Sequence, residues 1–371
     1  MCLSVLAAGC STIPPRPTGA KPPDWDAAQD HPPANESAPA APLPATPTRG
    51  ATVQKPSPIE TRKPDARPLP TAPQPLPPEQ TWISLSRWAA QRGFNPPRCL
   101  SVAPTASFSQ DTTNGVLLVQ EGSLAAFWDQ MEFRLGFNPQ FIGGQIFLHV
   151  LDLQKNIEPQ LQGSNGAAKS NRVVVLDPGH GGLNAGTRSA EDGRWEKEFT
   201  LDWAQRLAPL LETNGWRVFL TRTKDEDVSL PDRVAFAERR QADLFLSLHF
   251  NSSGNGTTDQ AGLETYCMTP AGMPSSLTRG YSDDPDQVYP NNAYDVENLQ
   301  YAARLHRSLL KVANFTDRGV RRARYQSVVR AQRRPAVLIE GGYLSNPAEA
   351  RRIADPAFRQ QLAEAVAQAL E

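Results

Sequence analysis

The sequence predicts an α/β protein with an open, mostly parallel sheet and helices on both faces, preceded by a small α/β domain and a disordered, proline-rich tether. Three observations lead to this prediction. From Arg172 onward, apolar runs alternate with helical patterns, as in a parallel sheet covered by helices. Residues 81–155 combine short apolar segments with glycine turns. Residues 11–80 hold 20 of the 35 prolines, too many for one compact fold.

Composition narrows the class of protein. A chain of 371 residues suggests two domains, and a net charge of −1 argues against nucleic acid as a partner, which selects a strongly basic face. No run of 18 apolar residues occurs, so no transmembrane helix is expected. The four cysteines (Cys2, Cys10, Cys99 and Cys267) have no C-x-x-C spacing and indicate neither a zinc ribbon nor a dense disulfide framework. A Cys99–Cys267 bridge is disfavoured because the two lie in separate segments.

Residues 1–10, MCLSVLAAGC, resemble a bacterial lipoprotein signal, in which a short apolar stretch ends in Ala-Gly-Cys. In that interpretation Cys10 becomes the lipidated first residue and attaches the protein to a membrane. The apolar stretch is short and no Lys or Arg precedes it, so an ordinary N-terminus is the alternative. A cell-envelope, periplasmic location follows from the signal.

Residues 11–80 are predicted to be a disordered linker. They contain a single aromatic residue, Trp25, and seven basic residues that balance seven acidic ones. Such a segment cannot bury enough apolar surface to offset its chain entropy, and its prolines favour polyproline II. Fully extended, it would span roughly 200 Å at about 3.1 Å per residue, so it could carry a domain away from a membrane.

Residues 81–155 are predicted to form a small α/β accessory domain. A short amphipathic helix is expected within 82–94, and strands within 115–123 and 143–153. The segment resembles the small α/β domain found near the N-terminus of some copper amine oxidases and in several cell-wall proteins. His149 alternates with apolar neighbours, so we expect it to be structural. Residues 163–171, GSNGAAKSN, are predicted to be a flexible joint.

Residues 172–371 are predicted to form the second domain. Strands are expected at 172–176, 217–221, 243–248, 263–267 and 335–340. Helices are expected at 198–215, 229–241 and 295–312, and after Asn346-Pro347 and Asp355-Pro356. Ser229 is a predicted N-cap, with Asp232 three residues later. In an open parallel sheet the functional site lies beyond the carboxyl ends of the strands.

Three polar residues stand at those carboxyl ends: His180, His249 and Glu340. A fourth candidate, Glu196, opens a predicted helix. Two histidines and a carboxylate, with one position left for water, are a common catalytic zinc set, and Glu340 would remain to take a proton from that water. Any one of these residues alone would more often be structural, and they are not a compact motif such as H-E-x-x-H. Their shared position at strand ends favours the functional interpretation.

Residues 172–370 resemble the zinc-dependent N-acetylmuramoyl-L-alanine amidases of bacterial cell-wall remodelling. The motifs that carry the resemblance are VVVLDPGHGG, EKEFTLDWAQRLAPLLE, RVFLTRTKDEDVSLPDRVAFAERRQADLFLSLHFNSS, GLETYCMTP and DRGVRRARYQSVVRAQRRPAVLIEGGYLSNPAEARRI. The resemblance implies zinc as cofactor, with His180, Glu196 and His249 as ligands and Glu340 as the catalytic base. Glu196 is chosen over Glu191 and Glu198 because the family's acid directly precedes a lysine.

The implied substrate is peptidoglycan, cut between the lactyl group of N-acetylmuramic acid and L-alanine of the stem peptide. Two other classes compete with this one: another zinc hydrolase of the cell wall (a peptidase or deacetylase), and a non-catalytic wall-binding module. The four candidate residues argue against the module, since a binder needs no general base. The sequence does not identify an activating protein partner.

Two further segments have open interpretations. Residues 268–294, rich in Pro, Ser, Asp and Asn, are either a wall of the site or a solvated loop. Residues 317–334 contain seven arginines; such a run is usually a solvated face, but it could hold carboxylates of the stem peptide. Glu264 is either a partner of the metal ligands or paired with an arginine.

Overall fold

The computed structural model describes residues 67–71, 81–162, 172–254 and 257–371. The predicted signal at 1–10 with Cys10, the joint at 163–171 and all but residues 67–71 of the predicted linker lie outside the described residues. None of the helices in the described ranges is both long and apolar enough to span a membrane.

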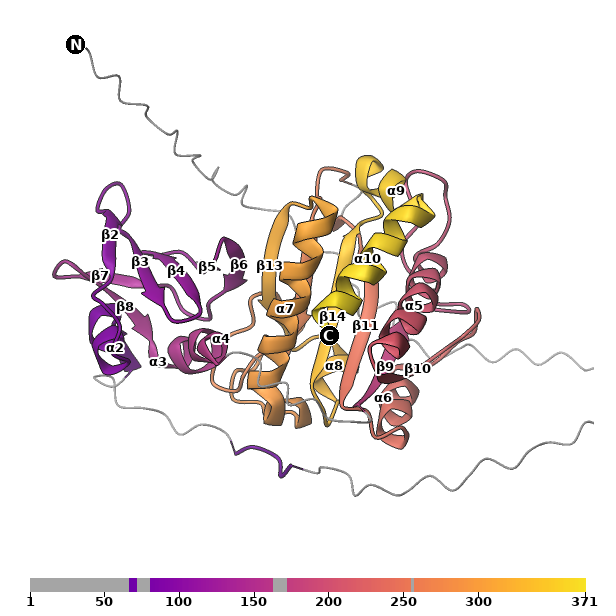
Figure 1. Cartoon of the computed structure of the whole chain (residues 1–371), viewed down its shortest axis with the longest axis horizontal. Coiled ribbons are helices and arrows are strands. Elements are labelled where there is room, and N and C mark those ends of the chain that lie inside the picture. The colour runs from indigo at the N-terminus through magenta and orange to yellow at the C-terminus, as the bar shows by residue number, and fades with distance from the viewer. Residues whose placement is uncertain (1–66, 72–80, 163–171, 255–256) are drawn as a thin grey trace, which may run out of the picture.

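A large sheet forms the centre of residues 172–371 (Figure 1). Its order is β10-β9-β11-β14-β12-β13. The four strands β10, β9, β11 and β14 are parallel, β12 runs antiparallel to β14, and β13 is parallel to β12. The predicted mostly parallel sheet is therefore confirmed, with one antiparallel step. The bounds are β9 Arg172–Pro178, β10 Trp216–Leu220, β11 Leu244–Asn251, β12 Leu263–Cys267, β13 Asp317–Arg322 and β14 Ala336–Tyr343.

Helices cover both faces of this sheet because successive strand residues point to opposite sides. In β9, Val174 and Leu176 pack in the core beneath α5, α7 and α10, whereas Val173 and Val175 pack in a second core beneath α6 and α8. Figure 1 shows α5, α7 and α10 lying side by side across the near face. The bounds are α5 Glu196–Thr213, α6 Leu230–Arg239, α7 Asp295–Ala313, α8 Ser327–Arg330, α9 Pro347–Ala354 and α10 Pro356–Ala369.

Side-chain caps begin the helices where the sequence predicts. The hydroxyl of Ser229 accepts from the backbone N–H of Asp232 (3.2 Å), and Asn346 and Asp355 cap α9 and α10 in the same way. Each such cap contributes about 1 kcal/mol. Helix α5 begins at Glu196, the residue predicted to open it, and Glu198 accepts a hydrogen bond from the backbone N–H of Trp195 (3.0 Å).

Residues 81–162 form an antiparallel unit that extends the large sheet. Strands β2 to β6 pair in succession, and β6 pairs with β13 through Phe133 and Val320, so the continuous sheet has 11 strands. A second, three-stranded sheet has the order β1-β8-β7. The bounds are β1 Trp82–Ser84, α2 Leu85–Gln91, β2 Arg98–Ser101, β3 Ser107–Thr112, β4 Gly115–Gln120, β5 Ala125–Trp128, β6 Met131–Arg134, β7 Gln140–Ile142, β8 Gln145–His149, α3 Val150–Asp152, η1 Leu153–Ile157 and α4 Glu158–Leu161.

His149 is structural, as predicted. Its ring stacks on Phe137 at 3.6 Å between centroids and meets Trp82 edge-on, and its Nδ1 accepts from the backbone N–H of Leu151. Burial lowers the pKa of His149 to about 4, which keeps the ring neutral. Cys99 and Cys267 are both free thiols, so no bridge joins them.

The expected solvated arginine face at 317–334 is wrong. Residues 317–322 are strand β13, and the side chains of Arg321, Arg322, Arg324 and Arg334 are buried. Arg322 donates to the carbonyls of Lys155 and Met268. Guanidinium groups can be buried here because carbonyl and carboxylate oxygens satisfy their donors, which composition alone does not reveal.

The 268–294 segment is not simply a solvated loop. Met268, Thr269 and Met273 are fully buried, and a 3₁₀ helix, η3, spans Pro290–Tyr294. Arg279 from its middle reaches the cavity described below, which favours its interpretation as a wall of the site.

Candidate metal centre

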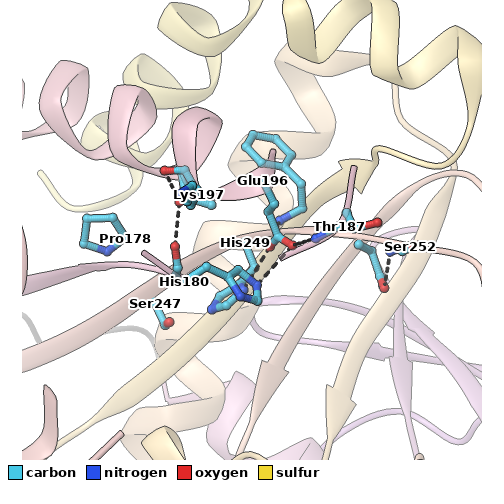
Figure 2. A network of polar contacts seen from close by, with 12 residues as sticks. Pro178, His180, Thr187, Glu196, Lys197, Ser247, His249 and Ser252 are labelled. Atoms are coloured by element: carbon cyan, nitrogen blue, oxygen red, sulfur yellow. Dashed lines mark hydrogen bonds and ion pairs between the residues drawn. The ribbon is translucent and has the colours of Figure 1, made fainter. Parts of the chain in front are cut away.

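Three candidate ligands converge at the carboxyl end of the sheet. His180 lies in the turn after β9, His249 lies near the end of β11, and Glu196 is the first residue of α5. Figure 2 shows the three side chains pointing toward one another. One carboxylate oxygen of Glu196 lies 3.0 Å from His180 Nε2, and the other lies 3.1 Å from His249 Nδ1. One potential ligand atom from each residue lies within 4.8 Å of the other two.

Glycines make this convergence possible. A Cβ on Gly179 would lie 2.2 Å from the ring of His249, and one on Gly186 would lie 2.6 Å from a carboxylate oxygen of Glu196. Neither position can carry a side chain without moving a candidate ligand. His180 itself has a φ of 63°, a left-handed conformation that is uncommon outside glycine and is retained where the surroundings enforce it.

Buried arginines enforce the backbone of the His180 turn. Arg233 donates to the carbonyls of Pro178 (2.9 Å) and His180 (2.7 Å) and forms an ion pair with Asp177 (2.7 Å). Arg222 donates to the carbonyls of Pro178 (3.0 Å) and Gly179 (2.9 Å). The two guanidinium groups therefore donate four hydrogen bonds to the backbone carbonyls of this turn. These bonds hold His180 rigidly.

The structure distinguishes the three nearby glutamates. Only Glu196, among Glu191, Glu196 and Glu198, lies beside both histidines. Glu198 caps α5, and Glu191 contacts Arg351 at the surface. Lys197, the residue after Glu196, donates to the carbonyl of Gly182 (2.8 Å). This bond connects the start of α5, which carries Glu196, to the glycine turn that follows His180.

Glu340 lies beside His249 because their strands are neighbours. The two residues are register partners in the parallel pair β11–β14. Glu340 is only 8% exposed, and its Oε2 is buried without a hydrogen-bond partner. A buried, unpartnered carboxylate oxygen is costly, so this arrangement is unusual unless the group serves a function.

These residues line one cavity of about 890 Å³. Glu340 and the three candidate ligands lie on its wall, and Leu183, which is 94% exposed, lies at its edge. Arg279 and Tyr325 also line it, together with Gln326 and Ser327 at the start of α8. The volume is in the range of small-molecule sites.

Charge and burial shift the pKa values of the site. Burial and the nearby charge of Glu196 raise the pKa of Glu340 to about 8. Burial opposes ionisation of Glu196, but both histidines outweigh it and hold its pKa well below the usual range. Burial also opposes the charged form of His180, but the Glu196 carboxylate outweighs burial and raises the pKa of His180. For His249 burial dominates and lowers the pKa. Carboxylates with such divergent pKa values typify catalytic sites.

Several residues of the site carry no sequence signal that would have identified them. Arg222, Arg233 and Arg279 lie in ordinary charged segments, and Asn184, whose Oδ1 lies 2.8 Å from His180 Nδ1, is one of many loop asparagines. Of the two roles considered for Glu264, the structure shows the pairing with arginine. Glu264 forms ion pairs with Arg318 and Arg321 and also accepts from Asn251 Nδ2 (2.7 Å), two residues after His249.

Comparison with known proteins places this site in a family. The N-acetylmuramoyl-L-alanine amidase family model matches residues 174–371. The amidase AmiA of Salmonella typhimurium is 29% identical over 238 residues, covering 57% of this chain and 81% of that protein. The sporulation-specific amidase of Bacillus subtilis is 32% identical over 200 residues, covering 53% and 66%.

Solved structures match the same part of the chain. The catalytic domain of CwlV, an amidase from Bacillus (Paenibacillus) polymyxa var. colistinus, is 31% identical, with 54% of this chain and 96% of that chain covered and a TM-score of 0.44. The family model spans more than half of the 371 residues and includes all four candidate site residues. The chain therefore belongs to the N-acetylmuramoyl-L-alanine amidase family.

Proposed function

We propose that this protein hydrolyses the amide between the lactyl group of N-acetylmuramic acid and L-alanine of the peptidoglycan stem peptide, with zinc held by His180, Glu196 and His249 and with Glu340 as general base. The observation that carries the proposal is the convergence of these four side chains in one cavity of the amidase domain. The family match supports the reaction, and the geometry supports the assignment of roles.

The three ligand candidates suit zinc. Imidazole nitrogens and a carboxylate oxygen are its usual catalytic ligands, with one position left open. Within the part of the chain that the structure describes, His180 Nε2 is buried without a hydrogen-bond partner and lies 3.0 Å from a carboxylate oxygen of Glu196, so the nitrogen is available to a metal. Asn184 on the other ring nitrogen would orient the imidazole, as partners of metal-bound histidines commonly do. When bound, zinc would polarise the scissile carbonyl and make water acidic near neutral pH.

Glu340 is suited to move the proton. It faces the cavity from within β14, a strand that is buried along its whole length, so its position is fixed by the sheet. Its carboxylate accepts a proton from the attacking water and passes it to the nitrogen of the leaving L-alanine. Its raised pKa reflects an environment of burial and negative charge, and a bound cation would favour the carboxylate form.

We also infer that the protein acts in the cell envelope, where its substrate lies. Residues 1–10 would supply a lipid anchor at Cys10, and residues 11–80 a tether long enough for the catalytic domain to reach the wall. Residues 81–155 remain a proposed accessory domain that meets the catalytic domain through β6 and β13.

Mass spectrometry of peptidoglycan digested by the full chain tests the reaction. The proposal predicts stem peptides that begin with a free L-alanine amine, and glycan strands whose lactyl groups have lost their peptides. A peptidase would leave L-alanine on the sugar, and a deacetylase would remove only acetyl mass. Either of those product patterns would refute the proposal. Glu340→Gln protein serves as the matched control for contaminating hydrolases.

A further inference from the structure

We propose that Arg279 binds the first carboxylate of the stem peptide beyond L-alanine and so selects acidic over amidated stem peptides. This inference rests on the proposed function and deepens it by naming a specificity-determining residue. Its basis is the position of Arg279 on the cavity wall, in the segment 268–294 between β12 and α7.

The backbone of Arg279 is held in an unfavourable conformation. Arg279 has a φ of 46° and Gly280 a φ of 87°, and the backbone N–H of Tyr281 donates to the carbonyl of Thr278 (2.8 Å). Positive φ at both central residues defines a type I′ turn, which favours Asn, Asp or Gly at the first central position. Such strain concentrates at ligand-binding sites, and here it places a long cationic side chain at the tip of a tight turn.

The guanidinium of Arg279 is oriented by two neighbours. It donates to Asn251 Oδ1 (3.2 Å) and lies over the ring of Tyr325, 5.5 Å from its centroid. Tyr325 and Glu340 line the same cavity. The network continues from Asn251 to Glu264, which is buried, so the orientation of Arg279 is fixed from within the fold.

The remaining arginines near the cavity have structural roles. Arg233 also lines the cavity, but it is 4% exposed and is held by Asp177 and the His180 turn. Arg318 and Arg321 form ion pairs with Glu264. Of the described arginines, Arg233 and Arg279 line the cavity, and Arg279 is the one that does not hold the His180 turn. Arg279 is therefore positioned to meet an anionic part of a substrate, and the role suggested for the arginine run at 317–334 is assigned to a residue outside that run.

The chemistry of the substrate identifies the ligand. The scissile amide must lie at Glu340, and Arg279 shares that cavity, so the anion it meets lies a short distance along the peptide. A carboxylate matches the planar guanidinium, which can donate two parallel hydrogen bonds to it. A carboxamide at the same position offers one oxygen and no charge.

The test compares two soluble muropeptides that differ only in a carboxylate or carboxamide on the residue after L-alanine. The full chain should cleave the carboxylate form with a kcat/KM roughly 10- to 100-fold higher, the range expected for a charge-assisted contact. Arg279→Met should abolish this preference by weakening cleavage of the carboxylate form alone, mainly through KM. Arg279→Lys should restore part of the preference, because lysine keeps the positive charge but cannot donate two parallel hydrogen bonds to a carboxylate.

Arg239→Met is the matched control, because Arg239 is exposed on α6 and does not line the cavity; it should retain the full preference. Equal cleavage of both muropeptides by the unaltered protein would overturn the inference while leaving the proposed function intact. An equal fall on both substrates in Arg279→Met would overturn it as well, since that result assigns Arg279 to the reaction or to folding. Failure to cut the lactyl–alanine bond in either muropeptide would refute the proposed function itself.

Discussion

Replacing Glu340 by Gln separates a general base from a metal ligand. The side chain keeps its volume, so the packing at the end of β14 should be preserved. The amide cannot accept the proton of water, and the buried Oε2 that has no hydrogen-bond partner becomes part of a neutral group. We expect zinc content and substrate affinity to be unchanged, because His180, Glu196 and His249 are left intact.

The rate should fall by roughly 10²–10⁴-fold, the usual contribution of a positioned acid–base group. Glu340→Asp should recover only part of that loss. Its carboxylate is withdrawn by about 1.5 Å, the length of one carbon–carbon bond, and errors of about 1 Å can cost 10²-fold in rate. Because strand β14 is buried along its whole length, its backbone cannot shift to compensate.

The assay measures kcat on a soluble muropeptide at saturating substrate, with zinc determined by mass spectrometry on the same sample. Glu264→Gln provides a comparison, since Glu264 is also buried and is the register partner of Glu340 on β12 but does not line the cavity. Near-normal turnover of Glu340→Gln would refute the role of base. Loss of zinc in that variant would instead make Glu340 a ligand.

Three other predictions follow from the site and its surroundings. His249→Ala and Glu196→Gln should each lose zinc and activity. Glu198→Gln should keep both with little change in stability, because a glutamine at this third helical position can still accept the hydrogen bond from the backbone N–H of Trp195. Retention of metal and rate by Glu196→Gln alone would show that the wrong glutamate was chosen. Burial opposes ionisation of Glu264, but two arginines on β13 outweigh it and hold its pKa at about 2. The difference from 4.5 corresponds to about 3 kcal/mol of folding free energy, present above pH 4.5 and lost as the pH falls toward 2, so urea titrations of Glu264→Gln should depend less on pH across that window. Residues 81–371 alone should cleave soluble muropeptides at the rate of the full chain but digest intact wall more slowly, and equal digestion of both would contradict a tether.

The sequence was sufficient to predict five of the six strands in residues 172–371 and the convergence of the candidate residues. His180, His249 and Glu340 each follow an apolar run of the sequence. Their convergence could be predicted from one rule, that parallel strands present their carboxyl ends at the same edge of a sheet. The three strands, β9, β11 and β14, are indeed adjacent. The choice of Glu196 required the family resemblance. Periodicity alone would equally allow Glu198, whose capping role depends on where α5 begins.

Strand β13 was not predicted because its pattern is obscured by charge. Arg321 and Arg322 are both buried, so the alternation of polar and apolar residues that indicates a strand is absent. The partners that make this burial tolerable, Glu264 and the carbonyls of Lys155 and Met268, lie more than 50 residues away in sequence. Pairings of that kind are properties of the folded chain, and composition gives no access to them.

Chemistry and selectivity are supplied by different kinds of structure in this site. The candidate ligands and Glu340 stand on or directly beside strands and on the first turn of α5, where packing on both faces of the sheet fixes them. Arg279 stands on a tight turn within a long connection. Because a surface turn can change without disturbing the sheet, substitutions at Arg279 should alter which stem peptides are cut while the candidate ligands and Glu340 stay in place. Substitutions at the strand ends should abolish cleavage of every substrate together.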